Sequence, residues 1–306
     1  MDDALRVTRL TPPAGPVSMV LDTDTANEID DHFALAWALL SPQRLKLEAV
    51  YAAPFHNSLS TGPGDGMCKS LRQIERIVAL AGRTADVPAV AGSERWMEGP
   101  ASPVKSDAAA DLVRRAMEDR PGPLYVASIA APTNIASAIL LESGIIERIV
   151  VVWLAGQPLE WPSASEFNLR QDLHASRVLL DSGVPLVLIP CSLVAEQLRT
   201  TLWELEARFK GRGPLGEHLY AAAADFYARH KIHSNVLWDL SAVAWLLEPK
   251  WVTTDLRHAP RLMDQVTWSA DGQRHLMRVA RHIGRDGIFD DLCARLEAHA
   301  SGKGAS

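Results

Sequence analysis

A run of acidic and polar side chains near the N-terminus is the part of the sequence best suited to chemistry. It reads Asp22-Thr-Asp24-Thr-Ala-Asn27-Glu28-Ile-Asp30-Asp31, with four aspartates and one glutamate within ten residues. Carboxylates brought this close together repel one another unless a cation or a shared proton neutralises them. Because the ligands within this run are all oxygens, with no His or Cys among them, the expected ion is calcium or magnesium rather than zinc.

Helix capping is an alternative explanation for part of this run. Asn27, Glu28, Asp30 and Asp31 stand where a helix is predicted to begin. Side chains of these types satisfy free backbone N–H groups there and favour the positive end of the helix. Capping explains about two of the five acids, and it leaves the strand-end residues Asp22 and Asp24 unexplained.

Two phosphate-related motifs fit the sequence less well. Asp22-Thr-Asp24-Thr resembles the start of a haloacid-dehalogenase-type phosphatase, a magnesium enzyme, but that family usually keeps its next acidic pair far downstream. The Gly-rich loop 61–66 fails as a phosphate loop, because Lys69 is not adjacent to its last glycine and no strand leads straight into it.

Three more polar segments lie beside predicted helices. Asp239 precedes an apolar helix, Glu166-Phe-Asn168 leads into another, and Thr133-Asn134 follows a predicted strand. Capping explains each of the first two taken alone. The segment around Thr133 is expected to present backbone carbonyls at the edge of the sheet.

The elements that must position these residues alternate between strand and helix. The predicted strands cover 17–22, 45–53, 124–130, 147–154 and 184–190, and the predicted helices cover 30–40, 67–82, 169–182, a stretch starting near 192, 214–229, 237–247 and 286–298, with a hairpin around 270–272. This alternation predicts a layered α/β fold whose parallel strands are covered on both faces. Ligands bind beyond the carboxyl ends of such strands. We expect one domain, 1–306, with a loose segment at 1–16.

Composition excludes several functional classes. The 306 residues are 47% hydrophobic, and 31 Lys+Arg against 37 Asp+Glu give a net charge of -6 without a basic tract, which disfavours nucleic-acid binding. Three scattered cysteines without a CxxC pair argue against a disulfide framework or structural zinc. With neither a secretory leader nor a membrane-spanning run in view, we expect a cytoplasmic protein that does not insert into membranes.

Taken together, these segments resemble the inosine-uridine preferring nucleoside hydrolase family over nearly the whole chain. The resemblance rests on the acidic cluster, Thr133-Asn134, Glu166-Phe-Asn168 and Asp239 before Ala-Val-Ala, in that order. It implies a mixed, mostly parallel sheet with helices on both faces and a Ca²⁺ ion at the strand ends. It also implies hydrolysis of the N-glycosidic bond of ribonucleosides by a homodimer or homotetramer.

The resemblance assigns a role to each matching residue. The family's calcium ligands match Asp24, Asp31, Asp239 and the carbonyl of Thr133. Asp24 also matches the general base that activates a metal-bound water, and Asp22 matches an acid beside the ion. The positions that bind ribose hydroxyls match Asp30, Asn57, Glu166 and Asn168, and Trp238 is placed to stack on the base.

The sequence departs from the family's pattern at three places. Five residues separate Asp24 from Asp30, which is two more than usual, so Asn27 and Glu28 come close to the expected metal. Trp238 occupies the position where many members have a proton-donating His. Finally, the Asn that contacts the sugar in relatives is absent. The candidate replacements are His230 and His233 for the proton donor, Trp96 and Trp161 for base stacking, and Gln157 and Glu160 for the sugar contact.

Three functions therefore stay open. The first is calcium-dependent hydrolysis of ribonucleosides to ribose and free base. The second is a calcium-dependent riboside-binding protein with little or no catalysis, a hypothesis motivated by Trp238 at the His position. The third is a magnesium phosphatase, which release of phosphate rather than reducing sugar would reveal.

Overall fold

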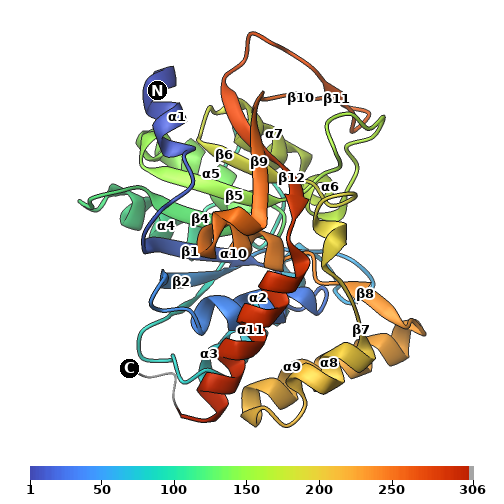
Figure 1. Ribbon diagram of the computed structural model, residues 1–306. Coiled ribbons are helices and arrows are strands. Elements are labelled where there is room, and N and C mark those ends of the chain that lie inside the picture. The colour runs from blue at the N-terminus through green and yellow to red at the C-terminus, as the bar shows by residue number, and fades with distance from the viewer. Residues whose placement is uncertain (303–306) are drawn as a thin grey trace.

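An eight-stranded sheet forms the centre of the molecule, in the order β3-β2-β1-β4-β5-β6-β12-β9 (Figure 1). The computed structural model describes residues 1–302. Its strands are β1 (Val17–Thr23), β2 (Leu45–Ala52), β3 (Ala89–Ala91), β4 (Leu124–Ser128), β5 (Ile149–Leu154), β6 (Leu186–Ile189), β7 (Arg199–Thr201), β8 (Ser234–Val236), β9 (Val252–His258), β10 (Arg261–Leu262), β11 (Trp268–Ser269) and β12 (Leu276–Ile283).

Helices connect most of these strands. They are α1 (Asp3–Arg9), α2 (Asp30–Leu39), α3 (Pro63–Leu80), α4 (Asp107–Met117), α5 (Thr133–Leu141), α6 (Phe167–Gln171), α7 (Leu173–Asp181), α8 (Leu202–Phe209), α9 (Gly213–His230), α10 (Leu240–Leu247) and α11 (Arg285–Ala300), with short 3-10 helices η1 (Ser143–Glu147), η2 (Ala195–Leu198) and η3 (Pro249–Trp251). In Figure 1, α8 and α9 lie at the lower right, outside the layer of strands.

The sheet is parallel from β3 through β12, and β9 alone runs antiparallel, against β12. The predicted α/β class with a mixed, mostly parallel sheet is therefore confirmed. The chain builds outward from β1 to β3 on one side and from β4 to β6 on the other, so β1 and β4 are neighbours where the strand order reverses. Ligand sites of open α/β sheets lie at such a switch point.

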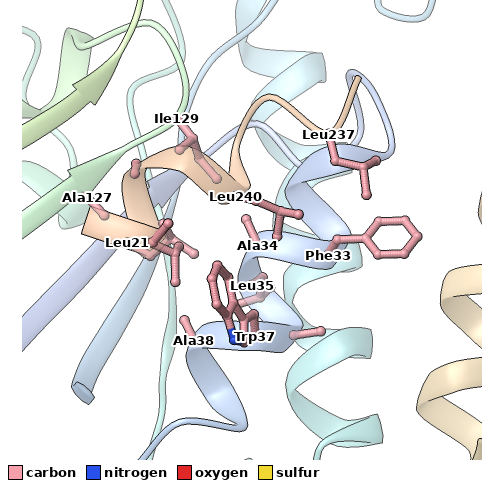
Figure 2. Close-up of a cluster of buried hydrophobic side chains, with 14 of the residues drawn as sticks. Leu21, Phe33, Ala34, Leu35, Trp37, Ala38, Ala127, Ile129, Leu237 and Leu240 are labelled. Carbon is pink, nitrogen blue, oxygen red and sulfur yellow. The ribbon is translucent and has the colours of Figure 1, made fainter. Parts of the chain in front are cut away.

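Both faces of the sheet are covered, as the continuous apolar strands predict. Alternate residues of β5 enter different cores: Val150 and Val152 pack with helices α2, α10 and α11, whereas Val151 and Trp153 pack with α4, α5 and α7. Figure 2 shows part of the first core, where Leu21 of β1 meets the apolar side chains of α2.

Helices α2 and α10 are buried on every side. All ten residues of α2 and all eight of α10 are buried, which is typical of a helix in the interior of a layered fold. The two helices contact each other, and Leu240 of α10 lies beside Ala34 of α2 in Figure 2. Their packing brings together the two helix starts that carry Asp30, Asp31 and Asp239.

Part of the segment 1–16, which we expect to be loose, is attached to the rest of the fold. It contains α1, where the guanidinium of the buried Arg6 donates a hydrogen bond to the carbonyl of Gly183. The carbonyl of Leu10 accepts one from Arg278 on β12. These partners lie far away in the sequence, which is why local composition did not reveal them.

The helix predicted to start near Ser192 is wrong. Leu193 adopts a positive φ of 65°, a conformation that a right-handed helix excludes. The chain instead forms η2 and then β7, and α8 follows directly. Strand β7 pairs antiparallel with β8, which lies further along the chain after α9.

Two other predicted elements have different partners or bounds. The residues around 270–272 do form a turn, but β11 pairs with β10 and β12 pairs with β9, so no hairpin closes there. The predicted helix 169–182 is divided into α6 and α7 at Asp172, whose Oδ1 accepts from the N–H of Ala175 (3.0 Å) and caps α7.

Within residues 1–302, no helix combines the length and hydropathy that crossing a bilayer requires.

Candidate active site

Most of the predicted site residues line a pocket of about 270 Å³ at the switch point of the sheet. Its lining comes from the loop after β1, the ends of β4, β5 and β6, and the starts of α2, α6 and α10. The residues that line it are Asp24, Asn27, Glu28, Asp30, Asp31, Ile129, Leu154, Gln157, Glu166, Phe167, Asn168, Cys191, Ser192, Trp238 and Asp239. Of the sequence-predicted residues, Asp22, Asn57 and Thr133 are outside this lining.

Three buried carboxylates form the centre of this pocket. Asp30, Asp31 and Asp239 each offer an oxygen within 4.8 Å of the other two. Asp31 is fixed by the hydroxyl of Thr23, which donates to its Oδ1. Asp239 immediately precedes α10 but makes no capping hydrogen bond, so capping does not account for it. Its carboxylate is free to serve the cluster.

Asp24 faces the same pocket from the end of the first strand. It is 2% exposed, and its Oδ2 is buried without a hydrogen-bond partner. Burial raises the pKa of Asp24 well above its ordinary value, and the negative charges of Asp31 and Asp30 raise it further. An unpartnered buried carboxylate oxygen is costly on its own, so this arrangement calls for a cation or a proton.

The rest of the cluster shows the same electrostatic strain. Burial raises the pKa of Asp31 to about 7, although its hydrogen bond with Thr23 opposes the rise. Burial also raises the pKa values of Asp30 and Asp239 well above normal, and the negative charges of neighbouring carboxylates raise them further. A hard divalent cation relieves such repulsion, and oxygen-only donors are those that calcium prefers. The residues present therefore fit a hard divalent cation, of which calcium is one.

Asp22 lies outside the pocket lining and is hydrogen-bonded to a neighbouring element. Its Oδ1 accepts a hydrogen bond from Asn134 Nδ2 (2.8 Å), and burial raises its pKa to about 7. The Oδ1 of Asn134 in turn accepts from the N–H (2.8 Å) and the hydroxyl (2.9 Å) of Ser93. Gly92 permits this bridge, because a Cβ there would lie 1.9 Å from the carbonyl oxygen of Ala52.

Glu166 both caps α6 and lines the pocket. Its carboxylate accepts hydrogen bonds from the N–H groups of Asn168 (2.9 Å), Leu169 (3.1 Å) and Gly156 (2.9 Å). Gly156 has a φ of 68°, a left-handed conformation that favours glycine and aims this N–H at Glu166. A carboxylate has about four lone-pair sites, so little of Glu166 is left for a ligand. Asn168 Nδ2 donates to the carbonyl of Leu154 (3.1 Å).

Asn57 reaches the site only through the lengthened loop 25–29. Its Nδ2 donates to Asn27 Oδ1 (2.7 Å), and its own Oδ1 accepts from the N–H of Leu59 (2.8 Å). The same loop is fastened to Ser70 of α3, through the hydroxyl of Thr25 (3.0 Å) and the N–H of Ala26 (3.2 Å).

The side chain of Thr133 makes a hydrogen bond outside the pocket lining. Its hydroxyl donates to Asp172 Oδ2 (2.9 Å), whereas the residue after β4 that lines the pocket is Ile129. The sequence reasoning passed over Ile129 and also over Cys191 and Ser192, which follow β6 at the same edge. The position of all three just beyond parallel strands is the signal that identifies them.

Of the candidate replacements for the missing His and Asn, only some line the pocket. Neither His230 nor His233 lines the pocket: the first packs against Phe226 (ring centroids 4.3 Å apart) and the second stacks on Trp203 (6.4 Å). Gln157 lines the pocket, while Glu160 is paired with Arg281 (3.0 Å). Neither Trp96 nor Trp161 belongs to the lining, which does include Trp238.

A second cavity of about 380 Å³ lies on the other side of loop 25–29. Asn27 and Glu28 line both cavities, and residues of α3 and α9, among them Gln73 and His218, complete the second one. The loop is therefore the wall between the two.

Comparison with known proteins identifies the family. Residues 19–290 match the model of the inosine-uridine preferring nucleoside hydrolases, so the match includes every pocket residue. The chain belongs to this family. The assignment agrees with the resemblance found in the sequence.

Curated relatives of the nucleoside hydrolase described here are ribonucleoside hydrolases. It is 26% identical to the pyrimidine-specific ribonucleoside hydrolase RihA of Citrobacter koseri over 315 residues, covering 89% of this chain and 96% of that protein. It is 27% identical to RihA of Escherichia coli O7:K1 over 325 residues, covering 92% and 99%.

Solved structures share the fold. A purine-preferring ribonucleoside hydrolase from Gardnerella vaginalis superposes with a TM-score of 0.74 at 21% identity, covering 92% of this chain and 99% of that one. The plant nucleoside hydrolase PpNRh1 gives a TM-score of 0.73 at 19% identity, with the same coverage.

Proposed function

We propose that this protein hydrolyses the N-glycosidic bond of ribonucleosides, giving ribose and free base, with calcium bound at the acidic cluster. The observation that carries the proposal is the convergence of Asp24, Asp31 and Asp239 with Asn168 in one pocket of a nucleoside hydrolase fold. From the resemblance we also expect a homodimer or homotetramer, which light scattering measures.

The cation is assigned to the oxygens nearest the cluster centre. Asp31 and Asp239 would hold it, with Asp24 and Asp30 completing the set of carboxylates. For the carbonyl ligand we prefer Ile129 to Thr133, because Ile129 lines the pocket and Thr133 does not. When bound, the cation supplies positive charge that orients vicinal hydroxyl groups and lowers the pKa of a neighbouring water.

The protein's own groups then perform the displacement. Asp24 accepts the proton of the attacking water at its unpartnered Oδ2. Asn168 and the remaining capacity of Glu166 hold the sugar hydroxyls, and Asn57 acts indirectly by holding Asn27. The carboxylates around C1′ favour the positive charge that develops there as the base leaves.

A riboside panel tests this function. Purified protein is incubated with purine and pyrimidine ribonucleosides, with calcium or with chelator, and reducing sugar is measured. We expect calcium-dependent release of ribose and a loss of at least about a hundredfold in kcat for Asp24→Asn, the size of a general-base contribution. The matched control is Asp286→Asn, because Asp286 is an exposed acid in the first turn of α11. An unchanged kcat in Asp24→Asn contradicts the mechanism.

A calcium-dependent riboside-binding protein is the second candidate. One observation favours it: among the described residues 1–302, no histidine lines the pocket, so the usual type of proton donor for the leaving base is missing. Calorimetric binding of inosine or uridine without ribose release, across the whole panel, would support binding over catalysis.

A further inference from the structure

The lining of the substrate pocket has an unbalanced charge. Its acidic residues are Asp24, Glu28, Asp30, Asp31, Glu166 and Asp239, whereas within residues 1–302 it contains no Lys, Arg or His. A single divalent cation offsets two of these six formal charges. The lining therefore keeps an excess of negative formal charge that a neutral ligand does not offset.

Glu28 adds a carboxylate beside the acidic cluster, close enough to repel Asp30 and Asp31. It lies outside the Asp30-Asp31-Asp239 group and occupies the exposed rim of the pocket, on the wall formed by loop 25–29. The loop is held there by Ser70 and by the bond between Asn27 and Asn57. His230 is near enough to interact with Glu28 electrostatically but does not line the pocket.

Two aromatic rings line the same pocket. Phe167 comes from the start of α6 and the half-buried Trp238 from the segment before α10. The faces of such rings attract cations and bind cationic ring systems. Arg170 already lies over Phe167, with its Cζ 5.9 Å from the ring centroid, so Trp238 is the aromatic side chain with more capacity for a ligand.

Leaving-group chemistry connects these two features. A neutral base departs as an anion unless a donor protonates it, and excess negative charge around the site opposes that departure. A base that already carries a positive charge departs as a neutral molecule and needs no donor. Carboxylates and aromatic faces favour such a base in the bound substrate.

We propose, as an extension that rests on the proposed function, that the preferred substrates are N-ribosides with a positively charged leaving group, such as pyridinium ribosides and N7-alkylated purine ribosides. The oxygen of water forms the bond to C1′, and the C1′–N electron pair moves onto the ring and cancels its positive charge. One proton of the water passes to Asp24. No other proton transfer is needed, which accounts for the absence of a histidine from the lining.

Matched substrate pairs test the proposal at saturating calcium and neutral pH. Nicotinamide riboside is compared with its reduced, uncharged dihydro form, and 7-methylguanosine with guanosine. Because charged bases also leave more readily in water, kcat/KM is divided by the uncatalysed rate of each compound. We expect this quotient to be at least about tenfold larger for the charged member of each pair, a difference of about 1.4 kcal/mol.

Glu28→Gln separates the effect of charge from that of pocket shape. It should lower kcat/KM for the charged riboside about fivefold, as expected for a unit charge at about 4 Å in water, and change the value for the neutral partner much less. Glu75→Gln on the exposed surface of α3 is the matched control and should alter neither value. Glu28→Asp should recover part of the preference.

The outcomes distinguish this inference from the function beneath it. Equal quotients for charged and neutral ribosides, or equal losses for both in Glu28→Gln, overturn the charge preference and leave nucleoside hydrolysis intact. If no ribose is released from any of the four paired compounds, nor from inosine or uridine, the proposed hydrolysis is overturned. The charge preference is then overturned as well.

Discussion

At the scale of single residues, the acidic side chains of this pocket divide by how many of their oxygens the scaffold already uses. Glu166 accepts three backbone hydrogen bonds, whereas Asp239 makes no capping bond and Asp24 keeps a buried oxygen without a partner. The sequence showed that acids were present but not which of them were committed to capping. That distinction depends on backbone direction at each helix start, which residue types alone do not specify.

Asn134 offers a test of the support beneath the cluster. Asn134→Ala leaves Asp22 Oδ1 and the backbone N–H of Ser93 without their partner. We expect a loss of about 2–4 kcal/mol in the free energy of unfolding, the cost of stranding buried polar groups. Urea denaturation measures it. The control is Asn235→Ala, since Asn235 Nδ2 makes no hydrogen bond. Equal losses in both variants would show that the bridge to Asp22 is not the cause.

At the scale of elements, hydrophobic pattern was sufficient for the helices and strands that hold the site. The predicted strand 17–22 and helix 30–40 correspond closely to β1 and α2, and the helix 237–247 to α10. Pattern failed at residues 192–201, because nothing local marks the positive φ of Leu193 or the pairing of β7 with β8. Pattern also does not specify the path of the turn after β4, which places Ile129 and not Thr133 in the pocket lining.

Packing between α2 and α10 should control metal affinity. Leu240→Ala removes a fully buried side chain that lies beside Ala34, next to Asp239 in the chain. We expect a loss of about 2–5 kcal/mol in unfolding free energy together with weaker calcium binding, as the two helix starts lose their fixed spacing. Leu296→Ala in α11 is an equally buried control that carries no pocket residue. Calorimetric titration should show normal calcium affinity in this control, and a matching loss there would refute the coupling.

At the scale of the whole molecule, stability should depend on pH and calcium together. The folded-state pKa values of Asp22 and Asp31 are raised from 3.8 to about 7 by burial. Without metal, their stabilising contribution is fully present below about pH 4 and is lost as the pH rises through about 7. His32 acts in the opposite sense: burial lowers its pKa to about 4, so its contribution is present above about 6.5 and is lost as the pH falls toward 4.

Thermal unfolding with and without calcium isolates the carboxylates. Calcium would bind Asp31 and the other carboxylates of the cluster in their deprotonated form, so the calcium-induced rise in Tm should grow with pH and reach about 5 °C near pH 8. The titration of His32 is common to both samples and cancels in the difference. A calcium effect that is constant between about pH 5 and pH 8 would mean that these carboxylates are not the ligands.

Loop 25–29 separates the substrate pocket from the second cavity, and its residues Asn27 and Glu28 line both. A ligand in the second cavity would contact the same loop that lines the substrate pocket. Its binding should therefore change the turnover rate in the substrate pocket. Gln73 borders the second cavity alone. The kinetics of a Gln73 variant would therefore show how much the second cavity alone affects turnover.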